Sequence, residues 1–115
     1  YHGMAGMVSH IKDLGLIEAA AYQQIGCFDA AVKFARCEGI VPAPESSHAI
    51  RAVFDQAEQC KRDGTAKTIL FNLSGHGHFD MAAYTDYFAG NLEDRDYDEA
   101  ALQTALAALP QVAAE

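Results

Sequence analysis

The sequence has few basic residues, no long apolar run and no closely paired cysteines. Only 8 of its 115 residues are Lys or Arg, against 16 Asp or Glu, so the formal net charge is −8 with the histidines neutral. Nucleic acids and anionic membrane surfaces both bind through clustered Lys and Arg side chains. No apolar stretch approaches the ~20 residues needed to cross a bilayer. The composition therefore argues against nucleic-acid and membrane partners.

The cysteines and the start of the chain indicate the compartment. Cys27, Cys37 and Cys60 are odd in number, and none lies in a C-x-x-C pair. This pattern favours reduced thiols in a cytoplasmic protein over a secreted disulfide framework. No basic segment followed by an apolar stretch marks a signal peptide. Because the first residue is not Met, we expect the chain to begin within a larger reading frame or after a removed tag.

Hydrophobic periodicity predicts a helix-rich α/β fold in one domain. A chain of 115 residues, half of them hydrophobic, is sized for a single core. Pro42 and Pro44 predict extended backbone over residues 40–44. Ser46 or Ser47 is the expected cap of the helix that follows, which ends at the turn formed by Asp63 and Gly64. Five helices are expected, near residues 4–14, 28–38, 46–63, 81–89 and 98–109.

One strand is expected, with a second as an option. Residues 68–73 are short, largely apolar and partly β-branched, which is typical of a strand buried on both faces of a parallel sheet. Residues 16–22 fit either a short strand or a loop with some helix. Since one parallel strand makes no sheet, either residues 16–22 supply a partner or residues 68–73 come from a larger sheet.

Two segments carry residues suited to ligand binding. Ser74, Gly75 and Gly77 follow the predicted strand directly, where open α/β folds bind their ligands. The serine offers a hydroxyl, and the glycines allow a ligand to approach the backbone closely. Glu45 follows the proline-stiffened segment at a helix N-terminus, where it either offsets the helix dipole or faces a ligand. Read locally, each segment fits a structural role as well as a functional one.

Together, the two segments resemble a known family. The run EGIVPAPESSHA at residues 38–49, followed by NLSGHG at residues 72–77, resembles the C-terminal signature of tryptophan synthase β chains. Tyr1-His2-Gly3, Phe79-Asp80 and the helix spacing look closer to the divergent second branch of that family. The similarity extends to about Pro110 and corresponds to about the last quarter of such an enzyme. It implies a single partial domain over residues 1–115, derived from the type II fold of pyridoxal-phosphate enzymes.

The resemblance also assigns roles to individual residues. It implies that the hydroxyl of Ser74 hydrogen-bonds the pyridine nitrogen of pyridoxal phosphate, with Gly75 beside it and Glu45 near the cofactor ring. A neutral hydroxyl there leaves the ring nitrogen largely unprotonated, which suits β-elimination and replacement better than transamination. Tyr1 and Gly3 correspond loosely to part of a backbone-carbonyl site for a monovalent cation.

Other parts of the family pattern are absent from this sequence. The lysine that forms the Schiff base with the cofactor has no counterpart among the lysines, and the glycine-rich loop that holds the phosphate is missing too. The implied parent reaction joins L-serine or O-phosphoserine to indole, giving L-tryptophan. We expect the isolated chain to bind no cofactor and to be inactive, with the N-terminal part of the enzyme or a second copy as its partner. The lysines are Lys12, Lys33, Lys61 and Lys67.

Three other functions fit parts of the sequence. Glu45 and His48 have the i, i+3 spacing of carboxylate-bridged metal sites, to which His76 and His78 could add ligands, but no second Glu-x-x-His exists. A hydrolase built on Ser74 and His76 lacks the usual G-x-S-x-G turn. The acidic stretch at residues 93–99 is expected to be a solvated connection. The chain could also act as an oligomerising or protein-binding module, because apolar faces taken from a larger enzyme would remain exposed.

Overall fold

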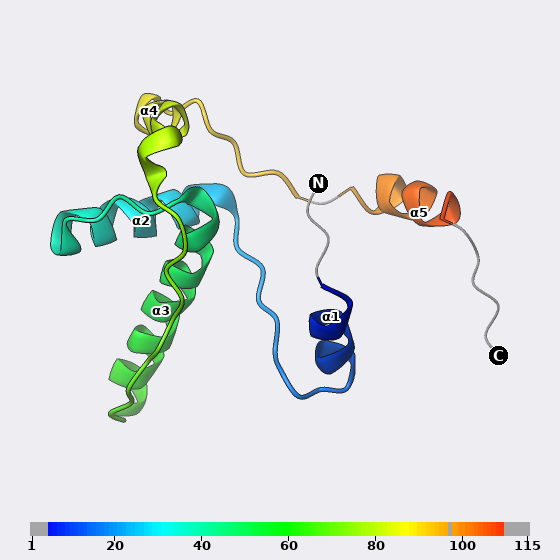
Figure 1. The fold of residues 1–115 in the computed structure, drawn as a ribbon, viewed down its shortest axis with the longest axis horizontal. Helices are drawn as coiled ribbons and strands as arrows, with labels where there is room; N and C mark the ends of the chain where they lie inside the picture. The colour runs from blue at the N-terminus through cyan, green and yellow to red at the C-terminus, as the bar shows by residue number, and fades with distance from the viewer. Residues whose placement is uncertain (1–4, 97, 110–115) are drawn as a thin grey trace.

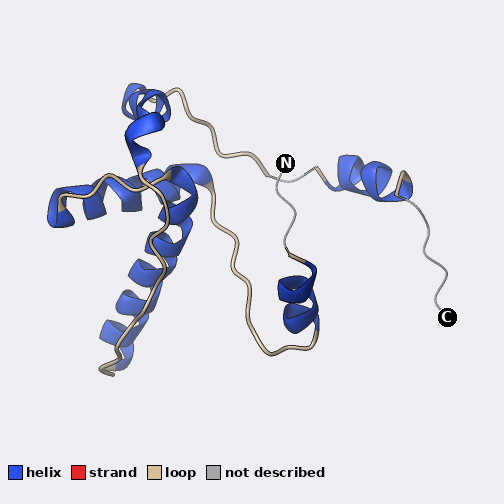
Figure 2. Cartoon of the chain, viewed as in Figure 1, coloured by secondary structure: helices blue, strands red, loops and turns tan. Residues whose placement is uncertain are grey.

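The computed structural model describes residues 5–96 and 98–109, and these form five α-helices and one 3₁₀ turn (Figure 1). No strand occurs in this described part of the chain, as Figure 2 shows. None of the helices found there is both long and apolar enough to cross a membrane. The elements are α1 (Gly6–Asp13), α2 (Gln24–Glu38), α3 (Pro44–Asp63), η1 (Gly77–Phe79), α4 (Met81–Ala89) and α5 (Glu99–Ala107).

Two helices begin earlier than expected: α2 at Gln24 and not near residue 28, and α3 at Pro44 and not at residue 46. The helix predicted to be capped by Ser46 or Ser47 begins at Pro44, with Ala43 as its extended N-cap residue. Pro fits the first helical position because it needs no N–H partner there and its φ is already helical. The capping prediction was therefore wrong, and both serines lie inside the first turn, where they are buried. The predicted extended segment ends one residue early, at Ala43.

The ordered core lies between α2, α3 and α4. Ala30 and Ala31 on α2 are fully buried, and so is Ile50 on α3. Ala31 packs with Phe28 and with Tyr84 of α4. Phe28 packs edge-on against Tyr84 of α4, with ring centroids 5.0 Å apart, and stacks on Tyr87 at 5.6 Å. The three rings attach α4 to the α2–α3 pair.

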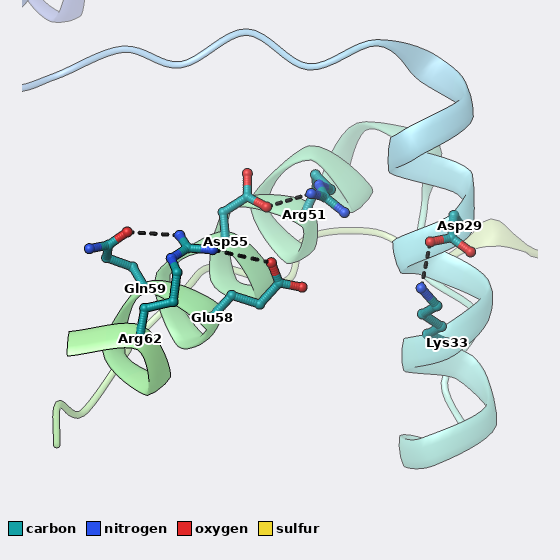
Figure 3. A network of polar contacts seen from close by, with 7 residues as sticks. All are labelled: Asp29, Lys33, Arg51, Asp55, Glu58, Gln59 and Arg62. Carbon is teal, nitrogen blue, oxygen red and sulfur yellow. Dashed lines mark hydrogen bonds and ion pairs between the residues drawn. The ribbon is translucent and has the colours of Figure 1, made fainter. Parts of the chain in front are cut away.

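Ion pairs on the helix surfaces add little to this core. Lys33 pairs with Asp29 on α2, and Arg51 with Asp55 on α3, each at i, i+4 spacing (Figure 3). Exposed pairs of this kind contribute about 0.3–0.5 kcal/mol each. The fold of the α2–α4 unit therefore depends on the apolar contacts.

The strand predicted at residues 68–73 does not form. After α3 the chain turns back at Gly64 and runs along that helix in extended form (Figure 1). Its side chains alternate as in a strand, since Leu70 is 94 % exposed while Phe71 packs edge-on against Phe34 of α2. However, residues 66–74 make no backbone–backbone hydrogen bond within the described chain. A strand needs a neighbour about 4.8 Å away, and residues 16–22 form a loop that does not supply one.

The acidic connection after α4 is attached to α2 and is not simply solvated. The Ile25 N–H in the first turn of α2 donates to the Asp94 carboxylate at 2.9 Å, and the Gln24 side chain donates to the Glu93 carbonyl at 2.6 Å. The side chain of Gln23, the N-cap residue of α2, makes no capping hydrogen bond. Asp94 therefore supplies the cap from 69 residues away, a contact that stabilises a helix by about 1 kcal/mol.

The two outer helices bury nothing. Neither α1 nor α5 has a buried residue, and Figure 1 shows both lying away from the α2–α4 unit. The radius of gyration is 17.4 Å, whereas a compact domain of this length has about 13 Å. The five expected helices are present, but the described residues are all-helical and not α/β as expected, and they leave much apolar surface uncovered.

Candidate functional site

The two sequence motifs that carried the resemblance lie in contact. The Gly77 N–H donates to the Val41 carbonyl at 2.9 Å, and the Tyr84 hydroxyl donates to the Pro42 carbonyl at 2.7 Å. The Val41 and Pro42 carbonyls are available for these bonds because the prolines keep this part of the first motif extended. In a helix, the same carbonyls would accept bonds from their own segment. The turn at residues 74–77 is therefore held against the N-terminus of α3.

Gly77 is the point of closest approach. It is buried, and a Cβ atom built there would lie 2.5 Å from the Pro42 carbonyl oxygen and 2.8 Å from a Val41 methyl group. Atoms this close overlap strongly, so only glycine fits. Two residues earlier, Gly75 has φ +70°, a left-handed conformation that favours glycine. Both glycines serve the junction between the two motifs.

Ser74 presents its hydroxyl at the surface of this junction. The side chain is exposed, and its Oγ lies 3.4 Å from the Oγ of Ser46 on α3. The Ser46 hydroxyl donates to the Ser74 main-chain carbonyl. Ser74 is therefore fixed at its backbone, while its hydroxyl lies at the surface and makes only a long contact with Ser46.

Glu45 lies at the same end of α3. It precedes Ser46 in the first turn and is exposed. Its carboxylate makes no hydrogen bond or ion pair with the other described residues. The structure thus places Ser74, Gly75 and Glu45 around one helix terminus, with Ser46 between them.

The lysines do not converge on this terminus. Lys61 follows Ser46 by fifteen residues on α3, which is about 22 Å along a helix. Lys33 on α2 pairs with Asp29 at 2.7 Å. Lys67 lies seven residues before Ser74 in extended chain, up to about 23 Å away. The site has a hydroxyl and a carboxylate without an adjacent amine.

The rival sites receive less support from the geometry. Among the described residues, no group of three or more His, Cys, Asp or Glu side chains could hold a metal ion. The rings of His76 and His78 are 4.9 Å apart, and Nδ1 of His76 accepts the N–H of His78. No hydrogen bond joins Ser74 to His76 in this part of the structure, so the hydrolase pair is not assembled. Tyr1 and Gly3, the residues matched to a cation site, lie outside the described residues.

Sequence reasoning missed two residues of the junction. Ser46 was interpreted as a helix cap and Tyr84 as an ordinary helix residue. Ser46 binds Ser74 of the second motif, and Tyr84, on α4, binds Pro42 of the first. The repeated serine at positions 46 and 47 was the available signal for the first. No local pattern indicates that the Tyr84 hydroxyl bonds to a carbonyl 42 residues away.

Buried Tyr84 gives the fold a dependence on alkaline pH. Burial raises the pKa of its phenol above 10.0, and the charge of Asp80 adds to the rise, whereas the nearby Ser47 hydroxyl opposes it. Since the folded pKa exceeds the unfolded one, the stabilisation is fully present below pH 10 and is lost as the pH rises through the folded pKa.

We therefore expect Tyr84→Phe to change both the stability and its pH dependence. The variant loses the bond to Pro42, which costs about 1–2 kcal/mol at neutral pH. Above pH 10 its free energy of unfolding should fall less steeply than that of the native chain, because Tyr84 no longer titrates. Urea unfolding at a series of pH values measures both effects. Burial also raises the pKa values of Cys27 and Tyr22, but these residues are present in both the native chain and the variant. The same dependence of the unfolding free energy on pH in the two proteins would therefore contradict the role given to Tyr84.

Known proteins share this sequence over most of its length. The tryptophan synthase beta chain 2 of Methanosarcina mazei is 61 % identical over 93 residues, which is 81 % of this chain and 21 % of that protein. The tryptophan synthase beta chain 2 of Aquifex aeolicus is 58 % identical over 94 residues, 82 % of this chain and 22 % of that protein. The tryptophan synthase beta chain of Pyrococcus horikoshii is 50 % identical over 110 residues, 96 % of this chain and 24 % of that protein.

No protein-family model matches the chain. Identity of 50–61 % over more than 90 residues is nevertheless far above chance, and the relatives named beta chain 2 agree with the branch expected from the motifs. The chain spans about a fifth of the length of these curated relatives. It is therefore homologous to tryptophan synthase beta chain 2 and corresponds to a fragment of that fold.

Proposed function

We propose that this chain forms the wall of a pyridoxal-phosphate site in a tryptophan synthase β-like enzyme. The observation that carries the proposal is the contact between the two motifs, which places the Ser74 hydroxyl and Glu45 at the N-terminus of α3. The identity to tryptophan synthase beta chains supports it. The proposed cytoplasmic location fits the free cysteines Cys27, Cys37 and Cys60.

The described residues fit one edge of the cofactor. The exposed Ser74 hydroxyl can donate to a ring nitrogen, because its one contact with another described side chain, Ser46, is long at 3.4 Å. Gly75 has no side chain to block a flat ring from the backbone. When bound, pyridoxal phosphate withdraws electrons from the α-carbon of an amino-acid substrate. Ser74 tunes that withdrawal, since a neutral hydroxyl leaves the ring nitrogen largely unprotonated.

This edge suits β-replacement, and we propose that the parent reaction joins L-serine or O-phosphoserine to indole. The chain alone is proposed to be inactive. Catalysis requires an amine at the cofactor aldehyde and a cup for its phosphate, and the lysines of α1, α2 and α3 all lie outside the first turn of α3 that carries the site. The partner of this wall is then the remainder of the enzyme.

A chimera tests the proposal. This chain would replace the homologous segment of the Methanosarcina mazei tryptophan synthase beta chain 2, and tryptophan formation from L-serine and indole would be measured. We expect the chimera to be active and the isolated chain to give neither product nor a new cofactor absorbance band. Ser74→Ala in the chimera should lower kcat by a factor on the order of 100, while Thr85→Ala, which removes an exposed hydroxyl from α4, should not.

Two results would sink the proposal. One is a folded chimera that binds no pyridoxal phosphate. The other is cofactor-dependent activity in the isolated chain that disappears on substitution of Lys12, Lys33, Lys61 or Lys67.

A second function is favoured by the exposed apolar side chains. Leu70 and Phe79 are 94 % and 92 % exposed, and uncovered apolar surface of this kind promotes association. As an alternative, the chain would act as an oligomerising module. Size-exclusion chromatography with light scattering distinguishes the two ideas, because a monomer at all concentrations would exclude the module.

A further inference from the structure

Ser46 occupies an unusual position for a helix serine. It lies in the first turn of α3, is only 5 % exposed, and donates its hydroxyl proton to the carbonyl of Ser74 rather than to a carbonyl of its own helix. Its Oγ is also 3.4 Å from the Ser74 Oγ. The buried Ser46 side chain thus contacts both the carbonyl and the hydroxyl of Ser74, the residue proposed to meet the cofactor.

The neighbouring serine shows the ordinary arrangement. Ser47 is 1 % exposed, and its Oγ donates to the Ala43 carbonyl four residues earlier in the same helix, at 3.0 Å. Serine hydroxyls inside helices commonly bond in this way. Both side chains are buried in the same helical turn, but only that of Ser46 contacts the second motif.

We propose that Ser46 is a positioning residue that holds the Ser74 backbone and sets the direction of the Ser74 hydroxyl. A hydroxyl has one proton, and that of Ser46 goes to the Ser74 carbonyl. Ser46 can therefore only accept from the Ser74 hydroxyl, and at 3.4 Å this contact is longer than an ordinary O–H···O hydrogen bond. It orients the Ser74 hydroxyl weakly, so the Ser74 proton can turn to a ligand that accepts it at a shorter distance. Ser74 then acts as a donor toward a neutral ring nitrogen, a consequence that rests on the function proposed above.

The first test uses the chain itself and does not need a cofactor. Three-bond couplings between the α and β protons of Ser74 report its side-chain rotamers, and the carbonyl ¹³C shift of Ser74 reports the bond from Ser46. We expect a single rotamer in the native chain. Ser46→Ala should average the couplings and move the carbonyl resonance, whereas Ser47→Ala, which also removes one buried hydroxyl from the same turn, should change neither.

A conservative variant at position 46 distinguishes loss of the hydroxyl from loss of the fold. Ser46→Thr keeps the hydroxyl and should keep the Ser74 rotamer. Averaged couplings in the native chain would overturn the proposal without any variant. Identical Ser74 spectra in the Ser46→Ala and Ser47→Ala proteins would overturn it as well.

The second test separates this inference from the proposed function. In the chimera, Ser46→Ala should lower kcat roughly 10- to 100-fold with little change in KM, and Ser47→Ala should leave kcat unchanged. An active chimera with equal rates for both variants overturns the role of Ser46 and leaves the proposed function standing. If the chimera binds no cofactor but the Ser74 rotamer still depends on Ser46, the proposed function fails and the positioning contact stands.

Discussion

Gly77→Ala is expected to lower the free energy of unfolding by about 3 kcal/mol, because the added methyl group has no space. The new Cβ would lie 2.5 Å from the Pro42 carbonyl oxygen, 2.8 Å from Val41 Cγ1 and 3.0 Å from Tyr84 Cε2. The nearest of these atoms belongs to the backbone of a proline-flanked segment, which cannot shift cheaply. Urea unfolding followed by circular dichroism measures the loss.

Gly26→Ala is the matched control for this substitution. Gly26 lies in the first turn of α2, and a Cβ atom built there meets nothing within 4 Å. Alanine favours the helix over glycine, so the control should gain about 0.5 kcal/mol. Equal effects of the two substitutions would show that the two motifs are not packed against each other as described.

Phe28→Ala should cost about 3 kcal/mol or more and release α4 from the rest of the unit. Phe28 is 6 % exposed and contacts both Tyr84 and Tyr87, which are the main aromatic residues that α4 buries. Hydrogen exchange can locate the damage. Amides of α4 should lose protection first, while those around Ile50 in α3 should remain protected.

Phe88→Ala removes the same side chain from a site that is 64 % exposed on α4. We expect it to cost less than about 1 kcal/mol and to leave the exchange pattern unchanged. If the two substitutions had similar costs, α4 would not be held by the aromatic contacts of Phe28.

Local sequence predicted the existence of the helices well, because their apolar stripes and their terminal glycines are local signals. The apolar stripe of α2 and the glycines at positions 39, 64 and 90, all in left-handed conformation, mark helix faces and ends directly. The start of α3 was misplaced because Pro44 and Ser46 both suit a helix start, and the proline occupies the first position.

The strand could not be predicted correctly from local pattern. Residues 68–73 have the alternation of a strand, but a sheet also needs neighbouring backbone, which this part of the chain does not supply. The sequence named Ser74, Gly75 and Glu45 as candidate site residues, and their role stays a prediction. Their grouping at one helix end and the contact from Ser46 depend on long-range packing that no single motif specifies.

The capping of α2 by Asp94 has a consequence for the order of folding. The bonds from Gln24 and Ile25 to Glu93 and Asp94 join residues 69 positions apart, whereas α2 and α3 are adjacent in the chain. Loop closure over a long separation costs more entropy than local pairing. The α2–α3 hairpin should therefore form early, and closure of the ring over residues 24–94 should come last, so that the first turn of α2 is the last part of the helix to become protected.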